Sequence, residues 1–186
     1  MNRGDALALM QEYTSKEGLR KHMLAVEAAM RAYAPRFGGD VETWGIVGLL
    51  HDFDYERWPD PPNHPLQGSA ILKEKGYPHE VIYAIKSHAD YLQDCPRVAP
   101  MDKALYACDE LTGLIMATAL MQPAGIGAVT VHSVRKKMKN KGFAAAINRD
   151  DLVNGAADLG VEMDEHIGVV LGAMQGIAKE LGFQAS

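Results

Sequence analysis

The chain reads Trp44-Gly45-Ile46-Val47-Gly48-Leu49-Leu50 through its most apolar run, and the dipeptide His51-Asp52 follows directly. A run of this kind is expected to be buried, so its end carries an imidazole and a carboxylate into an apolar environment. Burying these groups costs free energy unless hydrogen bonds or a metal ion satisfy them. The dipeptide is therefore the first candidate for a functional site, and a metal ion would satisfy both side chains directly.

The composition is that of an ordinary globular protein. Its 186 residues are 47% hydrophobic and 23% charged, which suits one domain with a sizeable core. The formal charge of −5 argues against nonspecific binding to nucleic acid, which needs a basic surface. Cys95 and Cys108 form neither a CxxC pair nor a disulfide framework. The sequence shows no signal-peptide pattern and no apolar run of membrane-spanning length, so we expect a cytoplasmic protein without a nucleic-acid or membrane partner.

Apolar residues recur with a helical period along most of the chain, and no alternating strand pattern persists. We therefore predict an all-α fold, a compact helical bundle that forms one domain over residues 1–186. The sequence Thr14-Ser15-Lys16-Glu17 has the form of a capping box and predicts the start of the second helix. Segment 53–63, rich in proline and aromatic residues, predicts an irregular loop. The predicted helices cover residues 5–13, 14–34, 40–52, 64–76, 78–90, 101–121, 130–140, 149–159 and 163–181.

Several polar residues fall on helix faces that otherwise carry apolar side chains. His22 shares a face with Leu19 and Val26, and His88 falls on a similar apolar face. Asp109 also lies on such a face, where an unpaired carboxylate is rare. These three side chains are expected to point into the core, where they need partners.

His64 stands at a predicted helix start, where its ring can turn toward a neighbouring element. With the residues above it completes a set drawn from five helical elements, and a bundle core can bring such a set together. Imidazole and carboxylate ligands together suit Fe, Mn, Co, Ni or Zn, whereas a Mg or Ca site would consist mostly of oxygen. We therefore predict one or two divalent transition-metal ions, held by His22, His51, Asp52, His64, His88 and Asp109.

The order of these residues resembles the HD superfamily of metal-dependent phosphohydrolases. The segment His64-Pro65-Leu66-Gln67-Gly68 also resembles one in the HD-GYP phosphodiesterase branch. The matching stretch runs from about residue 20 to residue 116, and helices within 130–186 are expected to pack on this core or cap it. The resemblance implies that one metal is held by His22, His51, Asp52 and Asp109, and that a second involves His64 and His88.

The chain departs from the family pattern just after the doublet. Two-metal relatives often carry HDxGK, whereas this chain continues Asp54-Tyr55-Glu56-Arg57. The resemblance implies a phosphomonoesterase or phosphodiesterase in which metal-activated water attacks a small phosphorylated metabolite. We expect a nucleotide as the substrate, and the oligomeric state stays open. The predicted catalytic residues are Asp52, Asp54 and Glu56, and the predicted substrate contacts are Arg20, Arg57 and Lys86.

The sequence leaves three alternatives open. The same ligand order fits a diiron oxygenase resembling myo-inositol oxygenase, and the fold also suits a non-catalytic nucleotide sensor. A basic cluster can form either a solvated helix face or an anion-binding wall over the site. His79 and His132 are expected at the surface, and His166 in a partly buried structural role. The basic cluster comprises Arg135, Lys136, Lys137, Lys139, Lys141 and Arg149.

Overall fold

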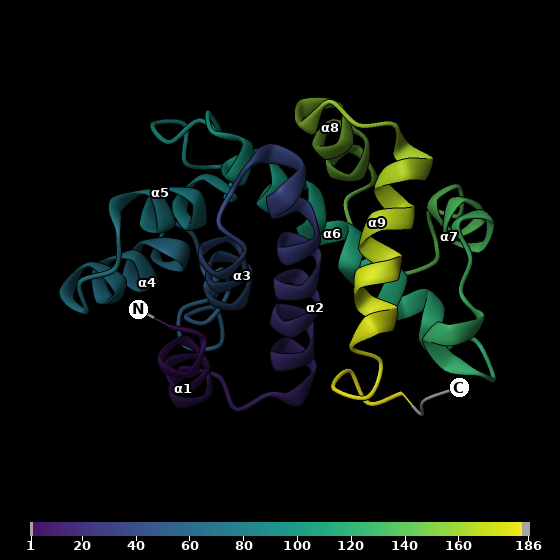
Figure 1. The fold of residues 1–186 in the computed structure, drawn as a ribbon, viewed down its shortest axis with the longest axis horizontal. Helices are drawn as coiled ribbons and strands as arrows, with labels where there is room; N and C mark the ends of the chain where they lie inside the picture. The colour runs from purple at the N-terminus through teal and green to yellow at the C-terminus, as the bar shows by residue number, and fades with distance from the viewer. Residues whose placement is uncertain (1, 184–186) are drawn as a thin grey trace.

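The computed structural model describes residues 2–183, which form nine α-helices and two short 3₁₀ helices without a β-strand (Figure 1). The predicted all-α fold is thereby confirmed. Among the described residues, no helix is both long enough and apolar enough to cross a membrane. The α-helices are α1 (Arg3–Tyr13), α2 (Glu17–Tyr33), α3 (Val41–Leu50), α4 (Asn63–Glu74), α5 (His79–Ser87), α6 (Pro100–Leu120), α7 (Val131–Met138), α8 (Arg149–Leu159) and α9 (Met163–Gly176), and the 3₁₀ helices are Ala34–Phe37 and Gly125–Ala128.

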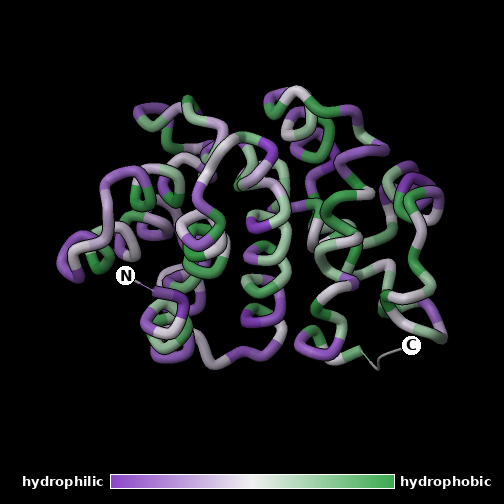
Figure 2. Tube along the Cα trace, viewed as in Figure 1, coloured by the Kyte–Doolittle hydropathy of each residue, from purple (hydrophilic) through white to green (hydrophobic). Residues whose placement is uncertain are grey.

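Helix α3 packs closely on α2, because two glycines remove the side chains that would separate them. A Cβ atom at Gly48 would lie 2.8 Å from the Val26 carbonyl oxygen, and one at Gly45 would lie 2.5 Å from the Arg31 side chain. Every residue from 44 to 50 is buried. In Figure 2 the trace of α2 alternates between hydrophilic and hydrophobic residues, as expected of a helix with one face on the core. This contact holds the C-terminal end of α3 close to α2.

The C-terminal helices pack on the same core from the other side. Helix α9 lies beside α2 (Figure 1) and also contacts α6. Helix α8 approaches α6 so closely that a Cβ atom at Gly155 would lie 2.7 Å from the Ala107 Cα atom. His166 of α9 is fully buried; its Nε2 atom lies 2.9 Å from the Ala107 carbonyl and its Nδ1 atom 2.6 Å from the Tyr33 hydroxyl. This confirms a structural role for His166, more deeply buried than predicted.

The predicted capping box at residues 14–17 is wrong. Helix α2 begins at Glu17, and its N-cap residue Lys16 makes no side-chain capping bond. The Thr14 hydroxyl instead donates to the Phe53 carbonyl at 3.0 Å. The backbone N–H groups of Ser15 and Lys16 donate to the Glu56 carboxylate at 2.9 Å each. A residue some 40 positions away therefore takes the place of the local cap.

Candidate metal centre

Three helices and two turns bring all six predicted ligand residues to one place. Helix α3 ends at Leu50, and His51, which is its C-cap residue, and Asp52 begin the turn that follows. His64 has an extended backbone (φ −80°, ψ 134°) just before the regular part of α4. The remaining ligand residues are His22 of α2, His88 at the end of α5 and Asp109 of α6.

The first group of ligand atoms gathers around His22. Its Nε2 atom lies 3.0 Å from Asp109 Oδ1 and 3.1 Å from His51 Nε2. His51 Nε2 in turn lies 3.6 Å from Asp52 Oδ2. Nitrogen and oxygen ligands in such a cluster are what a tetrahedral or octahedral transition-metal ion requires.

The second group lies on the other side of Asp52. The Asp52 Oδ1 atom is 3.2 Å from His64 Nε2 and 3.6 Å from His88 Nε2, and the two imidazole nitrogens are 3.3 Å apart. The two oxygens of Asp52 thus face different sets of imidazoles. Asp52 is the residue that belongs to both groups.

Each of the four imidazoles uses its Nδ1 atom elsewhere and presents Nε2 to the centre. His51 Nδ1 donates to the Gly48 carbonyl at 2.8 Å, and His88 Nδ1 donates to the Ile85 carbonyl. His64 Nδ1 donates to Asp54, and His22 Nδ1 lies 3.4 Å from the Thr112 hydroxyl, whose own proton goes to the Asp109 carbonyl. In the neutral rings this leaves lone pairs on four converging nitrogens. A cation between these nitrogens, whether a proton or a metal ion, removes the repulsion between the lone pairs, and four imidazoles with two carboxylates form a donor set that fits a metal ion.

The imidazoles and carboxylates of the cluster stabilise each other's charged forms. Burial lowers the pKa of His51, but the carboxylates of Asp52 and Asp109 outweigh it and raise the pKa to about 9. Burial of His64 is likewise outweighed by Asp52 and Asp54, and its pKa is also about 9. Although burial opposes it, the imidazoles hold the pKa values of Asp52 and Asp109 well below their ordinary range. Both carboxylates are therefore ionised and available as ligands.

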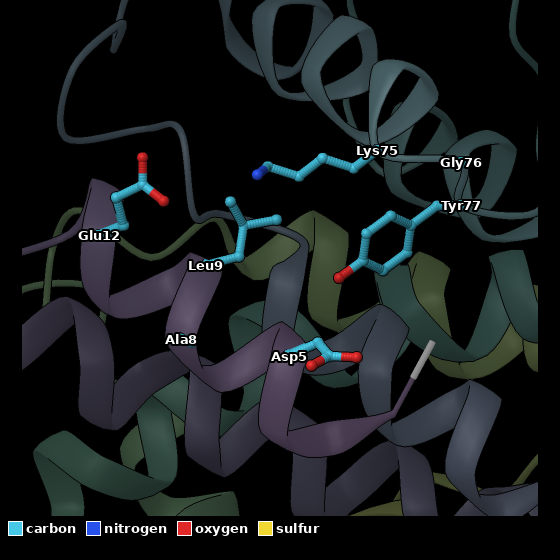
Figure 3. Close-up of a pocket in the computed structure, with 7 residues that line it drawn as sticks. All are labelled: Asp5, Ala8, Leu9, Glu12, Lys75, Gly76 and Tyr77. Carbon is cyan, nitrogen blue, oxygen red and sulfur yellow. The ribbon is translucent and has the colours of Figure 1, made fainter.

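An open cleft exposes this cluster to solvent. Five of the six ligand residues line it, whereas His51 is fully buried beneath. Burial, together with the nearby charges of Asp109 and Asp151, raises the pKa of Glu110 to about 7. A second cavity, between α1 and the turn from α4 to α5, contains none of the predicted ligands (Figure 3). Besides the ligands, the polar and aromatic walls of the open cleft are Tyr55, Asp90, Tyr91, Tyr106, Glu110 and Asp151.

Comparison with known families agrees with this arrangement. The family model for the HD domain matches residues 19–113, close to the stretch of 20–116 predicted from the motifs. The chain belongs to the HD domain family. Members of this superfamily are generally metal-dependent hydrolases, and the His and Asp groups of this chain are placed so that they could hold a metal ion. Among curated proteins, none matches the chain.

The HD fold gives Asp54 a different role from the predicted one. Its carboxylate is buried, and both of its oxygens are occupied, one by His64 Nδ1 and one by the Gly68 N–H, each at 2.7 Å. A Cβ atom at Gly68 would lie 2.7 Å from the Asp54 Cγ atom, so only glycine admits the carboxylate there. Asp54 lies behind His64 and does not line the cleft. We therefore correct its role from proton transfer to positioning of His64.

Four other predicted site residues lie outside the cleft. The Glu56 carboxylate accepts hydrogen bonds from the backbone N–H groups of Ser15 and Lys16, just before α2. Arg20 Nε donates to the Thr14 carbonyl at 2.6 Å, and the Arg57 guanidinium lies 3.9 Å from the centre of the Tyr13 ring. Lys86 does not line the cleft either. Proximity to a ligand in sequence was misleading for Arg20, Glu56 and Arg57, because their side chains contact the segment before α2 and not the centre.

The basic cluster does not form a wall over the HD site. None of its six residues is among those that line the cleft in the described part of the chain. Arg135 pairs with Asp164 at 2.9 Å, and Arg149 donates to the carbonyls of Ala144 and Ile147. The interpretation as an anion-binding wall is therefore wrong. His79 and His132 are exposed, as predicted.

Sequence reasoning missed most of the cleft walls. Glu110 directly follows a predicted ligand, and that adjacency was the one local signal available. Tyr91 and Asp90 come from the loop after α5, Tyr106 from one turn before Asp109, and Asp151 from α8. Nothing in the local pattern around Asp151 indicates that α8 reaches the site, because only the packing of α8 on α6 places it there.

Proposed function

We propose that the protein is a metal-dependent hydrolase of small phosphate esters. The observation that carries this proposal is the position of Asp52, whose two oxygens face two separate sets of imidazoles at the floor of an open cleft. Divalent ions held by these residues would supply hydroxide at neutral pH and neutralise charge on phosphoryl oxygens. The donor set favours Fe, Mn, Co, Ni or Zn over Mg.

The chain itself contributes orientation. The four imidazoles are fixed by Nδ1 contacts that come from the backbone or from buried side chains, so the ligand atoms are held before any ion binds. Among the described residues, no Lys or Arg lines the cleft. The phosphoryl group would therefore have to be held at the cluster of His and Asp residues, and the cleft walls are left to recognise the rest of the substrate.

Elemental analysis of anaerobically purified protein, followed by assays of phosphate release, tests this proposal. We expect metal-dependent release from at least one small ester in a panel of nucleotides, sugar phosphates and simple alkyl phosphates, assayed with Mn, Co, Ni and Mg. The panel also tests the expectation of a nucleotide substrate. Bound iron with turnover that depends on O₂ would replace the hydrolase with an oxygenase, and tight nucleotide binding without turnover would indicate a sensor.

A further inference from the structure

The cleft beside the proposed metal centre is negatively charged beyond what the ligands require. Three further carboxylates line it, those of Asp90, Glu110 and Asp151, together with three tyrosines. Acidic walls repel a phosphate group and do not contact the metal ligands by any hydrogen bond found in the described residues. They are therefore suited to a different part of the substrate.

Two of these carboxylates compete for a single proton. The Tyr106 hydroxyl lies 2.9 Å from Asp90 Oδ2 and 3.0 Å from Asp151 Oδ1, and it can donate to only one of them. Asp90 is also paired with Arg97, whose guanidinium stacks on the Tyr106 ring. Among the described cleft residues, no Lys or Arg is present to pair with Asp151. The charge of Asp90, on the side of the cleft formed by the loop after α5, is thus neutralised by Arg97. The charge of Asp151, on the side formed by α8, has no such partner.

Glu110 adds a second carboxyl group on that side, and no Lys or Arg of the described cleft lining pairs with it. It is partly buried and lines the same cleft as Asp151. The need for an acid at the start of α8 does not explain Asp151, since the neighbouring Asp150 is exposed in the same first turn and serves the helix dipole equally well. A cation in the cleft would satisfy both Glu110 and Asp151.

The aromatic walls point to an organic cation. Tyr55 and Tyr91 line the same cleft, and each residue is 43% exposed, so part of each is accessible to a ligand. Tyrosine faces attract ammonium groups, and this attraction adds to that of carboxylates. We propose that the cleft selects a phosphate ester whose alcohol part carries an ammonium group, with Glu110 and Asp151 as the residues that determine this specificity. This inference rests on the proposed function and names its substrate class.

A pair of phosphonates that cannot be hydrolysed tests the proposal by binding alone. The probes are 3-aminopropylphosphonate and butylphosphonate, which match in length and differ in the terminal ammonium. Each is titrated calorimetrically into Mn²⁺-loaded protein of measured metal content. We expect the amino compound to bind at least about tenfold more tightly, as is usual for a charge-assisted contact. The preference should shrink toward unity in Asp151→Asn and in Glu110→Gln.

Asp150→Asn is the matched control, because it removes a carboxylate from the same turn of α8 outside the cleft. It should keep the wild-type preference at equal metal content. Equal affinity for the two phosphonates, or no binding of the amino compound, would overturn the inference. Failure of the proposed function would give another result. The amino compound would still bind selectively, but no ester in the panel would release phosphate. Hydrolysis of 2-aminoethyl phosphate no faster than that of ethyl phosphate would refute the inference and leave the hydrolase standing.

Discussion

His64 donates from Nδ1 to Asp54 Oδ1 at 2.7 Å, while its Nε2 atom lies 3.2 Å from Asp52 Oδ1. The buried carboxylate of Asp54 thus orients the His64 imidazole toward a second carboxylate, that of Asp52. Because Asp54 also accepts the Gly68 N–H, it ties the turn after α3 to α4. A carboxylate behind a ligating histidine fixes the tautomer and makes the ring a better donor. The position of Asp54 explains why the segment from His64 to Gly68 needs both residues: His64 donates to the carboxylate, and Gly68 leaves room for it.

Asp54→Asn should weaken metal binding at the second group only. The amide keeps the size of the side chain but loses the negative charge and cannot satisfy both donors. We expect affinity at the His64 and His88 group to fall by roughly 10–100-fold, with the His22 group unchanged. A two-site calorimetric titration measures this, with the exposed Asp60→Asn as control. Equal weakening of both groups would show that Asp54 acts on the whole fold.

Asp52→Ala and His64→Ala should differ in metal stoichiometry. Asp52 belongs to both groups, so its loss should abolish metal binding together with activity. His64 belongs to one group, so its loss should remove at most one ion. Elemental analysis of the two purified variants provides the comparison. Full occupancy in Asp52→Ala would rule out the shared carboxylate, and loss of every ion in His64→Ala would rule out two independent groups.

Gly48→Ala should destabilise the protein through the contact of α2 with α3. The added methyl group would lie 2.8 Å from the backbone of Val26 and Glu27, which cannot move as a flexible side chain can. We expect a loss of about 1–3 kcal/mol in the free energy of unfolding, typical of an overpacked core. Gly172→Ala in α9 is the control, because nothing lies within 4 Å of its added methyl group. Urea unfolding should show the control variant unchanged or slightly more stable.

Metal loading should release protons at neutral pH. Carboxylates raise the pKa of both His51 and His64 to about 9, so these rings carry protons below that pH in the metal-free protein. An ion binds only the neutral ring. Metal affinity should therefore rise as the pH increases toward 9, and titrations in buffers of different ionisation enthalpy should give different apparent heats. Heats that do not depend on the buffer would contradict the proton exchange.

His166 should make the fold less stable in mild acid. Its Nε2 atom donates to the Ala107 carbonyl, so Nδ1 accepts the Tyr33 hydroxyl and the ring is held neutral. Burial lowers its pKa below the ordinary value near 6.5. Because the unfolded chain binds the proton more readily, this contribution is complete above pH ~6.5 and is lost as the pH falls from there toward the lowered value.

Metal-free protein in urea at pH 7.5 and pH 5.5 provides the measurement. His166→Gln should lose less stability between the two pH values than the wild type does. His132→Gln, which alters an exposed ring, should behave like the wild type. A pH dependence in His166→Gln equal to that of the wild type would assign the acid sensitivity to other groups.

The helices, and the convergence of the six candidate ligands, were largely predictable because both leave local traces in the sequence. Helical period and proline or glycine breaks indicate where helices lie, and imidazoles or carboxylates on apolar faces indicate which side chains need partners. The misassigned residues share another property. Arg20, Arg57 and Glu56 are close to ligands in sequence, but their directions depend on contacts with the segment before α2, which is distant in sequence from Arg57 and Glu56. The capping box failed for the same reason, since Glu56 from a distant turn displaced the local cap.

The sequence by itself determined the class of fold, the HD motif and the six candidate ligands, since periodicity and residue chemistry are local properties of the chain. Only the tertiary structure decided that the two oxygens of Asp52 face different imidazoles, that Asp54 stands behind His64, and that Asp151 of α8 reaches the cleft. Each of these depends on how closely two segments approach, and close approach is possible at Gly48, Gly68 and Gly155, where a missing side chain lets one segment lie directly against another.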